Sequence, residues 1–260
     1  MPASALYREA IFMAAIPSTS DNRVRPSRVT TWTGIAIAIA LPVLVTWVHF
    51  VGAGGKRQAA AYVVMQIVQF ALPLGWLWMV EGGRIEWGSP RYRGVGWGIA
   101  FGVAVIISAW VLFHRVLAHQ PFFTPAIDRM REKALDLGLM SPARYAAFGL
   151  FYTLIHSFLE EYYWRWFVFA RLRWLVRLWP AIVVSALGFT LHHVVLVGTF
   201  SDWALWSTLA FSAMVPIAGG FWAWLYDYAG SLAVPWISHA LVDAGIVIVG
   251  YDLVRHIWAN

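Results

Sequence analysis

The chain has 260 residues, of which 60% are hydrophobic and only 12% are charged. An ordinary soluble domain has about 25% charged residues, so this composition excludes that class. The formal net charge is +6, but the basic residues stand in short segments between apolar blocks. That placement favours contact with anionic lipid over nucleic-acid binding. Cysteine is absent, which excludes a disulfide framework and thiolate catalysis.

Apolar blocks of spanning length follow one another along the chain. About 20 apolar residues in a helix cross the ~30 Å hydrocarbon core of a bilayer, because each residue adds ~1.5 Å. We therefore predict an all-α, polytopic transmembrane helical bundle with about seven spanning helices. They are expected at about residues 32–52, 60–80, 95–116, 143–172, 180–197, 203–225 and 232–249.

The segments outside these blocks complete the predicted organisation. Residues 1–31 form an N-terminal tail, and the arginines there and in two later loops favour a cytoplasmic N-terminus. Residues 117–142 mix charged and apolar residues at helical spacing between prolines, which predicts an interfacial amphipathic helix. The first three spans and this helix make one region (32–142). A core (143–250) and a C-terminal tail (251–260) follow.

Ionisable side chains within the predicted spans are the strongest functional signal. Each costs at least ~2.5 kcal/mol at the centre of a spanning helix, so it is a candidate for function. Glu161 precedes Arg165 by four residues, the favoured order for an ion pair on one helix face. Glu160 points ~100° away from Glu161, which leaves it free to act as a general base beside His156, one turn earlier. The alternative is a packing network made of both acids and Arg165.

Histidines occur in two later spans. His192 and His193 are adjacent in the fifth predicted span. Neighbours on a helix face different directions, so we expect only one of them to reach the site. In the seventh span Asp243 follows His239 by four residues and could accept a hydrogen bond that fixes the imidazole orientation. The alternative is a hydrogen-bonded pair that only joins two helices.

These motifs, in this order and in successive spans, resemble those of the CPBP family, the CAAX protease and bacteriocin-processing proteins, also called the Abi family. Residues 160–165 are similar to the EExxxR motif of that family. Residues 189–193, from Phe189 to His193, resemble its FxxxH motif, and residues 239–243 its HxxxN/D motif. The resemblance covers about residues 143–250.

The resemblance implies a glutamate-dependent intramembrane endopeptidase, whose best-known relatives trim prenylated CAAX proteins. Glu160 would activate the attacking water together with His193, and Arg165 would hold Glu161. These assignments follow from the family pattern. The chemistry is coherent without it, because amide hydrolysis needs an activated water and a site for the developing negative charge.

His239 and Asp243 would help to stabilise the oxyanion by the same resemblance. Prenyl-processing relatives usually have asparagine where this chain has Asp243. An ionised aspartate has no N–H to donate, so we expect Asp243 to orient His239 instead. The catalytic set predicted from the sequence is therefore Glu160, His193, His239, Glu161, Arg165 and Asp243.

The expected substrate is a membrane protein or a lipidated peptide cleaved near its terminus. A prenylated CAAX protein, a bacterial C-terminal sorting signal and a leader peptide are the options. Membrane lipids are expected partners and nucleic acid is not. The chain is expected to be a multi-pass integral protein of the bacterial inner (plasma) membrane.

No cofactor or metal is expected, since no HExxH motif occurs. Zinc held by His193, His239 and Glu160 is the alternative that their ligand chemistry allows. Two other functions compete with proteolysis. One is a non-catalytic immunity or scaffold protein of the same fold, and the other is an intramembrane proton relay or transporter.

Overall fold

The computed structural model describes residues 25–52, 56–83 and 91–258. Within these ranges all regular secondary structure is helical, which confirms the predicted all-α transmembrane bundle. Most of the expected N-terminal tail lies outside the described residues. Six helical stretches in the described part are long and apolar enough to cross a membrane: Arg28–Phe50, Arg57–Met79, Val95–His119, Leu178–Phe200, Leu205–Ala229 and Ala233–Trp258.

The remaining expected span, at 143–172, is helical but divided into short pieces. It comprises α6 (Pro142–Leu150), a π-helical stretch (Phe151–His156), α7 (Ser157–Glu161), a second π-helical stretch (Tyr162–Phe169) and α8 (Ala170–Leu175). In π-helical turns the backbone bonds run from i to i+5, and such turns often mark functional sites. Here they stand on both sides of the adjacent glutamates.

Two helix boundaries extend beyond the apolar blocks. α2 (Arg28–Phe50) begins one turn before the predicted start, because the Oγ of Ser27 caps it by accepting from the backbone N–H of Thr30 at 3.1 Å. α12 (Ala233–Val254) continues into a 3₁₀ turn at Arg255–Trp258, past the predicted limit of the core.

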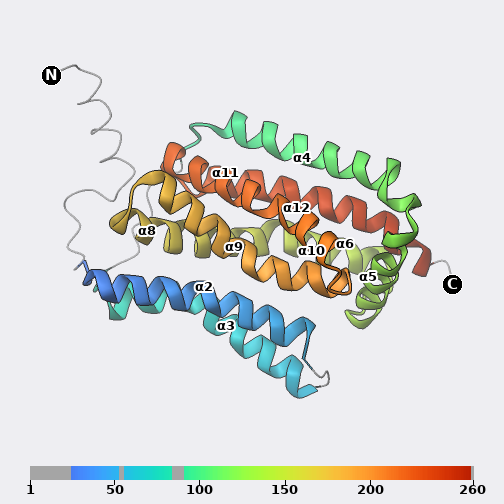
Figure 1. Ribbon diagram of the computed structural model, residues 1–260, viewed down its shortest axis with the longest axis horizontal. Helices are drawn as coiled ribbons and strands as arrows, with labels where there is room; N and C mark the ends of the chain where they lie inside the picture. Colours follow the sequence, from blue (N-terminus) through green and yellow to red (C-terminus); the bar gives the residue numbers. More distant parts are fainter. Residues whose placement is uncertain (1–24, 53–55, 84–90, 259–260) are drawn as a thin grey trace.

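The long helices run side by side along the longest axis of the molecule (Figure 1). α2 pairs with α3 (Lys56–Met79) and packs on α9 (Leu178–Phe200), which in turn packs on α11 (Met214–Ala229). α12 packs along α4 (Val95–Arg115).

Glycines allow the backbones of α4 and α12 to approach closely. A Cβ on Gly102 of α4 would lie 2.7 Å from Leu241, and one on Gly245 of α12 would lie 2.6 Å from Ile106. Small residues at helix interfaces have this role in membrane bundles, where van der Waals contact replaces the hydrophobic effect.

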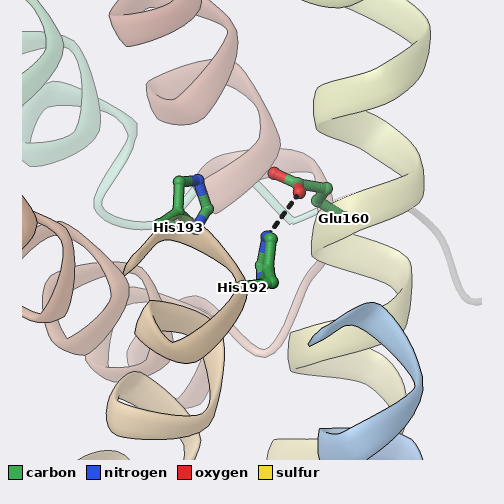
Figure 2. A group of neighbouring side chains, drawn as sticks. All are labelled: Glu160, His192 and His193. Atoms are coloured by element: carbon green, nitrogen blue, oxygen red, sulfur yellow. Dashed lines mark ion pairs between the residues drawn. The ribbon is translucent and has the colours of Figure 1, made fainter. Parts of the chain in front are cut away.

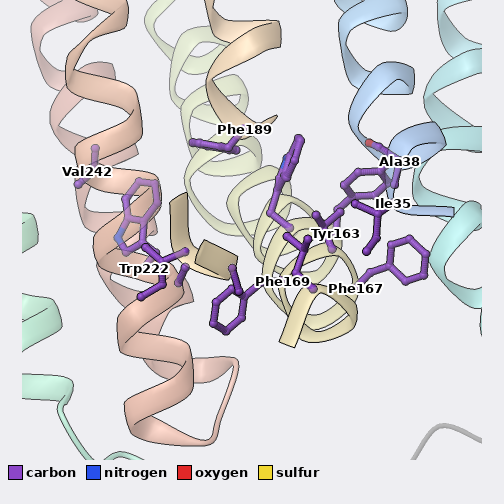
Figure 3. Close-up of a cluster of buried hydrophobic side chains, with 14 residues drawn as sticks. Ile35, Ala38, Tyr163, Phe167, Phe169, Phe189, Trp222 and Val242 are labelled. Carbon is purple, nitrogen blue, oxygen red and sulfur yellow. The ribbon is translucent and has the colours of Figure 1, made fainter. Parts of the chain in front are cut away.

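The largest buried apolar cluster surrounds the second π-helical stretch (Figure 3). Tyr163 and Phe167 face α2, and the hydroxyl of Tyr163 donates to the carbonyl oxygen of Ala38 at 2.8 Å. Trp222 of α11 and Phe189 of α9 lie on the other side of the cluster. This packing fixes the segment that directly follows the two glutamates.

The amphipathic segment 117–142 contains two 3₁₀ turns and α5 (Thr124–Asp136). α5 docks on the helix ends at one end of the bundle. Arg129 donates to the carbonyl oxygens of Thr199 and Phe200, both at 3.4 Å, and Arg131 to that of Leu253 at 3.0 Å. These carbonyls lie in the last turns of α9 and α12, where intrahelical donors run out.

Candidate active site

Glu160 and Glu161 end α7 and lie inside the bundle, with exposed fractions of 8% and 0%. Because adjacent side chains on a helix diverge, the two carboxylates have different neighbours. Glu161 faces Arg165 on its own helical segment, with Oε1 3.0 Å from Nη1. This is the contact expected from their spacing, and the π-helical turns beside it do not prevent it.

Glu161 also holds His239 of α12. The Nδ1–H of His239 donates to Oε1 of Glu161 at 2.7 Å, while Nη2 of Arg165 donates to the carbonyl oxygen of Gly219 at 3.2 Å. The indole of Trp222 stacks on the imidazole of His239 with ring centroids 3.9 Å apart and planes at 17°. The ring of His239 is thus fixed by a hydrogen bond at its edge and an aromatic contact on its face.

Glu160 is surrounded by three imidazoles. Its Oε1 lies 3.4 Å from Nε2 of His192 and 3.5 Å from Nε2 of His156, and its Oε2 lies 3.6 Å from Nε2 of His239. Figure 2 shows the approach of His192 from α9 toward this carboxylate. Among the described residues no arginine pairs with Glu160, as the helix geometry predicted, and its neighbours are groups that can exchange protons.

His193 lies beside this cluster but makes a different contact. Its Nδ1 is 3.0 Å from the carbonyl oxygen of Phe189, one turn earlier on α9. His192 is the neighbour that reaches Glu160, and its ring is parallel to that of Trp164, with centroids 5.8 Å apart. The resemblance assigned His193 as the partner of Glu160, but His192 makes this contact. The expectation that only one of the two rings would reach the site was also wrong, because both line the same cavity. The rotation of α9, which decides this, depends on its packing.

Asp243 lies one turn after His239 on α12, as its spacing requires. Its Oδ1 is 3.6 Å from Nε2 of His239, the same nitrogen that faces Glu160. The hydrogen bond that orients the ring is made at the other nitrogen, by Glu161. Sequence reasoning assigned the orienting role to Asp243 and missed this contact between α7 and α12. No spacing rule predicts a contact between residues so far apart in the chain.

The cluster opens onto a cavity of about 510 Å³. Glu160, His193, His239 and Asp243 all line it, together with His156 and His192. From this polar end the cavity continues between α2, α3, α9 and α12 toward α5, along walls that are mostly apolar. Four of the predicted site residues therefore share one cavity. Glu161 and Arg165 do not line it, but Glu161 holds His239, which does.

The side chains present could also hold a metal ion. Glu160, His192 and His193 each offer one ligand atom, and these atoms lie within 4.8 Å of one another. Zinc accepts carboxylate oxygen and imidazole nitrogen. This set has His192 in place of the His239 expected from the sequence.

One family model matches the chain. Residues 142–245 match the model described as type II CAAX prenyl endopeptidase Rce1-like, and the match spans α6 to the middle of α12. All six predicted site residues lie within it. No curated protein and no solved structure matches the chain.

Proposed function

We propose that the protein is a glutamate-dependent intramembrane endopeptidase, a proposal supported by the match of residues 142–245 to the Rce1-like CAAX prenyl endopeptidase model. It cleaves a membrane-embedded or lipidated polypeptide near its terminus. The observation that carries the proposal is the contact of Glu160 with three imidazoles on the wall of a cavity inside a helical bundle.

In this mechanism Glu160 takes a proton from a water molecule in the cavity, and the oxygen of that water attacks the scissile carbonyl carbon. His192, within 3.4 Å of Oε1, and His193, on the same wall, are the groups that relay the proton to the leaving amine. The C–N bond then breaks, giving a new carboxylate on one product and a new amine on the other.

His239 stabilises the developing oxyanion. With Nδ1 held by Glu161, a protonated ring presents its Nε2–H toward the cavity, where a tetrahedral oxyanion would accept it. Arg165 lies 3.0 Å from Glu161 and holds its carboxylate in place, so its part in the reaction is positional. Asp243 places its carboxylate 3.6 Å from the same Nε2 and adds negative charge beside the ring.

The substrate class follows from the surroundings of the site. A polar cluster inside a transmembrane bundle suits a bond that lies within or near the bilayer, and the apolar walls suit apolar residues or a lipid chain. Both a prenylated CAAX protein and a C-terminal sorting signal meet these conditions. The bacterial inner membrane is the location that we propose.

A non-catalytic scaffold or a proton relay would also bury acids and histidines. A cleavage assay separates these functions. Purified protein in liposomes is incubated with two synthetic peptides, one prenylated and CAAX-ended, the other an unmodified transmembrane peptide with a short C-terminal tail. Products are identified by mass spectrometry.

We expect wild-type protein to cleave at least one peptide and Glu160→Gln to lose roughly 10²- to 10⁴-fold in rate, the usual contribution of a general base. The matched control is Glu132→Gln, which removes an exposed carboxylate on α5. Cleavage by Glu160→Gln at the wild-type rate would overturn the proposed mechanism. Absence of any cleavage would favour the scaffold or the relay.

A further inference from the structure

The cavity is long enough to hold several residues of a polypeptide beyond the polar cluster. Its wall follows α9 from His192 to Phe200 and α12 from His239 to Val254. These stretches measure ~12 Å and ~22 Å at ~1.5 Å per residue. An extended chain covers ~3.3–3.6 Å per residue, so about three to six residues fit between Glu160 and the end of the cavity at α5.

The two ends of the cavity differ in charge. Glu160 and Asp243 lie at the polar end, whereas α5 contributes Lys133 at the other. Among the described residues, Lys133 is the one lysine or arginine that lines this cavity. Between the two ends the walls are formed mainly by aliphatic and aromatic side chains such as Leu196 and Ile246.

Lys133 differs from the other cations of its helix. Arg129 pairs with Asp202 at 3.0 Å, and Arg131 donates to the carbonyl oxygen of Leu253. No described carboxylate lies within ion-pair distance of Lys133, whose Nζ lies over the ring of Phe50, 5.1 Å from its centroid. A half-buried ammonium group on a cavity wall is therefore left without an anion.

We propose that Lys133 binds the free C-terminal carboxylate of the polypeptide whose scissile bond lies at Glu160. This inference rests on the proposed peptidase function. It adds the orientation of the substrate in the cavity and the length of the released fragment. The C-terminal end of the substrate lies toward α5, and the released fragment is a short peptide of about three to six residues.

A peptide carboxylate fits better than a phosphate headgroup of a lipid. The cavity connects Lys133 continuously with the catalytic cluster, so one extended chain can occupy both ends. A carboxylate also presents its negative charge at the end of such a chain, where Lys133 stands. An apolar wall with a single cation at its far end suits an apolar peptide tail with one terminal charge.

The test uses two peptides of the same sequence, one ending in a free carboxylate and the other in a carboxamide. Wild type, Lys133→Met, Lys133→Arg and Arg57→Met are compared in liposomes. Arg57 is an exposed arginine at the start of α3 that does not line the cavity, so Arg57→Met controls for loss of one positive charge. The kcat and KM are measured for both peptides.

We expect wild type to prefer the acid about tenfold through KM, the effect of one charge-assisted hydrogen bond near its lower limit. Lys133→Met should remove the preference with little change in kcat, Lys133→Arg should keep most of it, and Arg57→Met should keep all of it. Equal KM values for the two peptides in wild type would overturn the proposal. So would an equal loss on both peptides in Lys133→Met, since that indicates a structural role.

Binding to Glu160→Gln makes the test independent of cleavage. Tryptophan fluorescence reports the affinity of each peptide for Glu160→Gln and for Glu160→Gln with Lys133→Met. Tighter binding of the acid that depends on Lys133 supports the proposal even if wild type cleaves neither peptide, in which case the peptidase function alone fails. Equal affinities, with phosphatidylglycerol raising the unfolding temperature only when Lys133 is present, would assign Lys133 to lipid.

Discussion

Two buried carboxylate–arginine pairs hold this bundle together, and they differ in how completely they are satisfied. Glu81 and Arg171 form a bidentate pair between the end of α3 and α8, with Nε and Nη2 each 2.9 Å from a carboxylate oxygen. The third nitrogen of Arg171, Nη1, donates to the carbonyl oxygen of Trp166 at 2.6 Å. Both carboxylate oxygens of Glu81 and all three guanidinium nitrogens of Arg171 therefore have a hydrogen-bond partner.

The pair of Glu161 and Arg165 is less complete. One oxygen of Glu161 serves both Arg165 and His239, while Oε2 of Glu161 and Nε of Arg165 have no hydrogen-bond partner among the described residues. Unpaired buried polar atoms cost free energy, and they recur where a site has a function besides stability. We infer that the pair of Glu81 and Arg171 stabilises the fold, whereas the pair of Glu161 and Arg165 positions the imidazole of His239.

Removal of the Glu161 carboxylate is expected to have the larger effect, because it affects both stability and activity. Glu161→Gln strands Arg165 in the interior, and breaking a buried pair costs ~3–5 kcal/mol. It also weakens the hydrogen bond that orients His239. Thermal unfolding in detergent and turnover per folded molecule measure the two effects.

The double variant Glu161→Gln with Arg165→Met separates them. It should recover part of the stability, because no charge is then stranded, while activity stays at least tenfold below wild type because the Nδ1–H of His239 still lacks its carboxylate. Full recovery of activity in the double variant would mean that Glu161 acts only on stability. A stable, inactive Glu161→Gln, together with an active Glu160→Gln, would exchange the roles of the two glutamates.

The outer pair should affect stability alone. Glu81→Gln is expected to cost a similar ~3–5 kcal/mol in unfolding free energy, because Arg171 is 3% exposed and keeps its charge. Turnover per folded molecule should stay within about twofold of wild type, since neither residue lines the cavity. Glu81→Gln with Arg171→Met should be more stable than the single variant.

A selective loss of turnover in correctly folded Glu81→Gln would contradict the comparison. It would show that the contact between Glu81 and Arg171 affects the positions of the catalytic side chains as well as the stability of the fold. Measurement of unfolding and turnover on the same preparations distinguishes this outcome from simple loss of folded protein.

The local features of the fold and site could be predicted from the sequence, because they depend on spacing within one helix. Apolar blocks predicted the spanning segments, and four-residue spacing predicted the contact between Glu161 and Arg165. The contact between His239 and Glu161 could not be predicted in this way. It depends on the rotation and depth of α12 against α7, which the packing of many side chains sets together.

The same limit explains the histidine pair and the outer ion pair. His192 and His193 differ by ~100° around α9, so a modest rotation of that helix decides which ring faces Glu160. Glu81 directly follows the predicted second span (60–80), yet it is fully buried against Arg171. A charged residue at the end of an apolar block indicates the end of a spanning helix. The residue that pairs with this charge is known only from the tertiary structure.

The smallest expected effect is that of metal removal, and it tests whether the carboxylates of the site act without an ion. Glu160, His192 and His193 could hold zinc, yet three imidazole nitrogens already lie 3.4 to 3.6 Å from the carboxylate of Glu160. We therefore expect turnover to change by less than about twofold after exhaustive chelation and dialysis, measured beside the metal content of the same sample. Loss of turnover that one equivalent of zinc restores would assign Glu160 as a ligand. His192→Ala should then lower zinc affinity, because it removes one of the three ligands. If Glu160 and the histidines act without a metal, His192→Ala should lower only kcat.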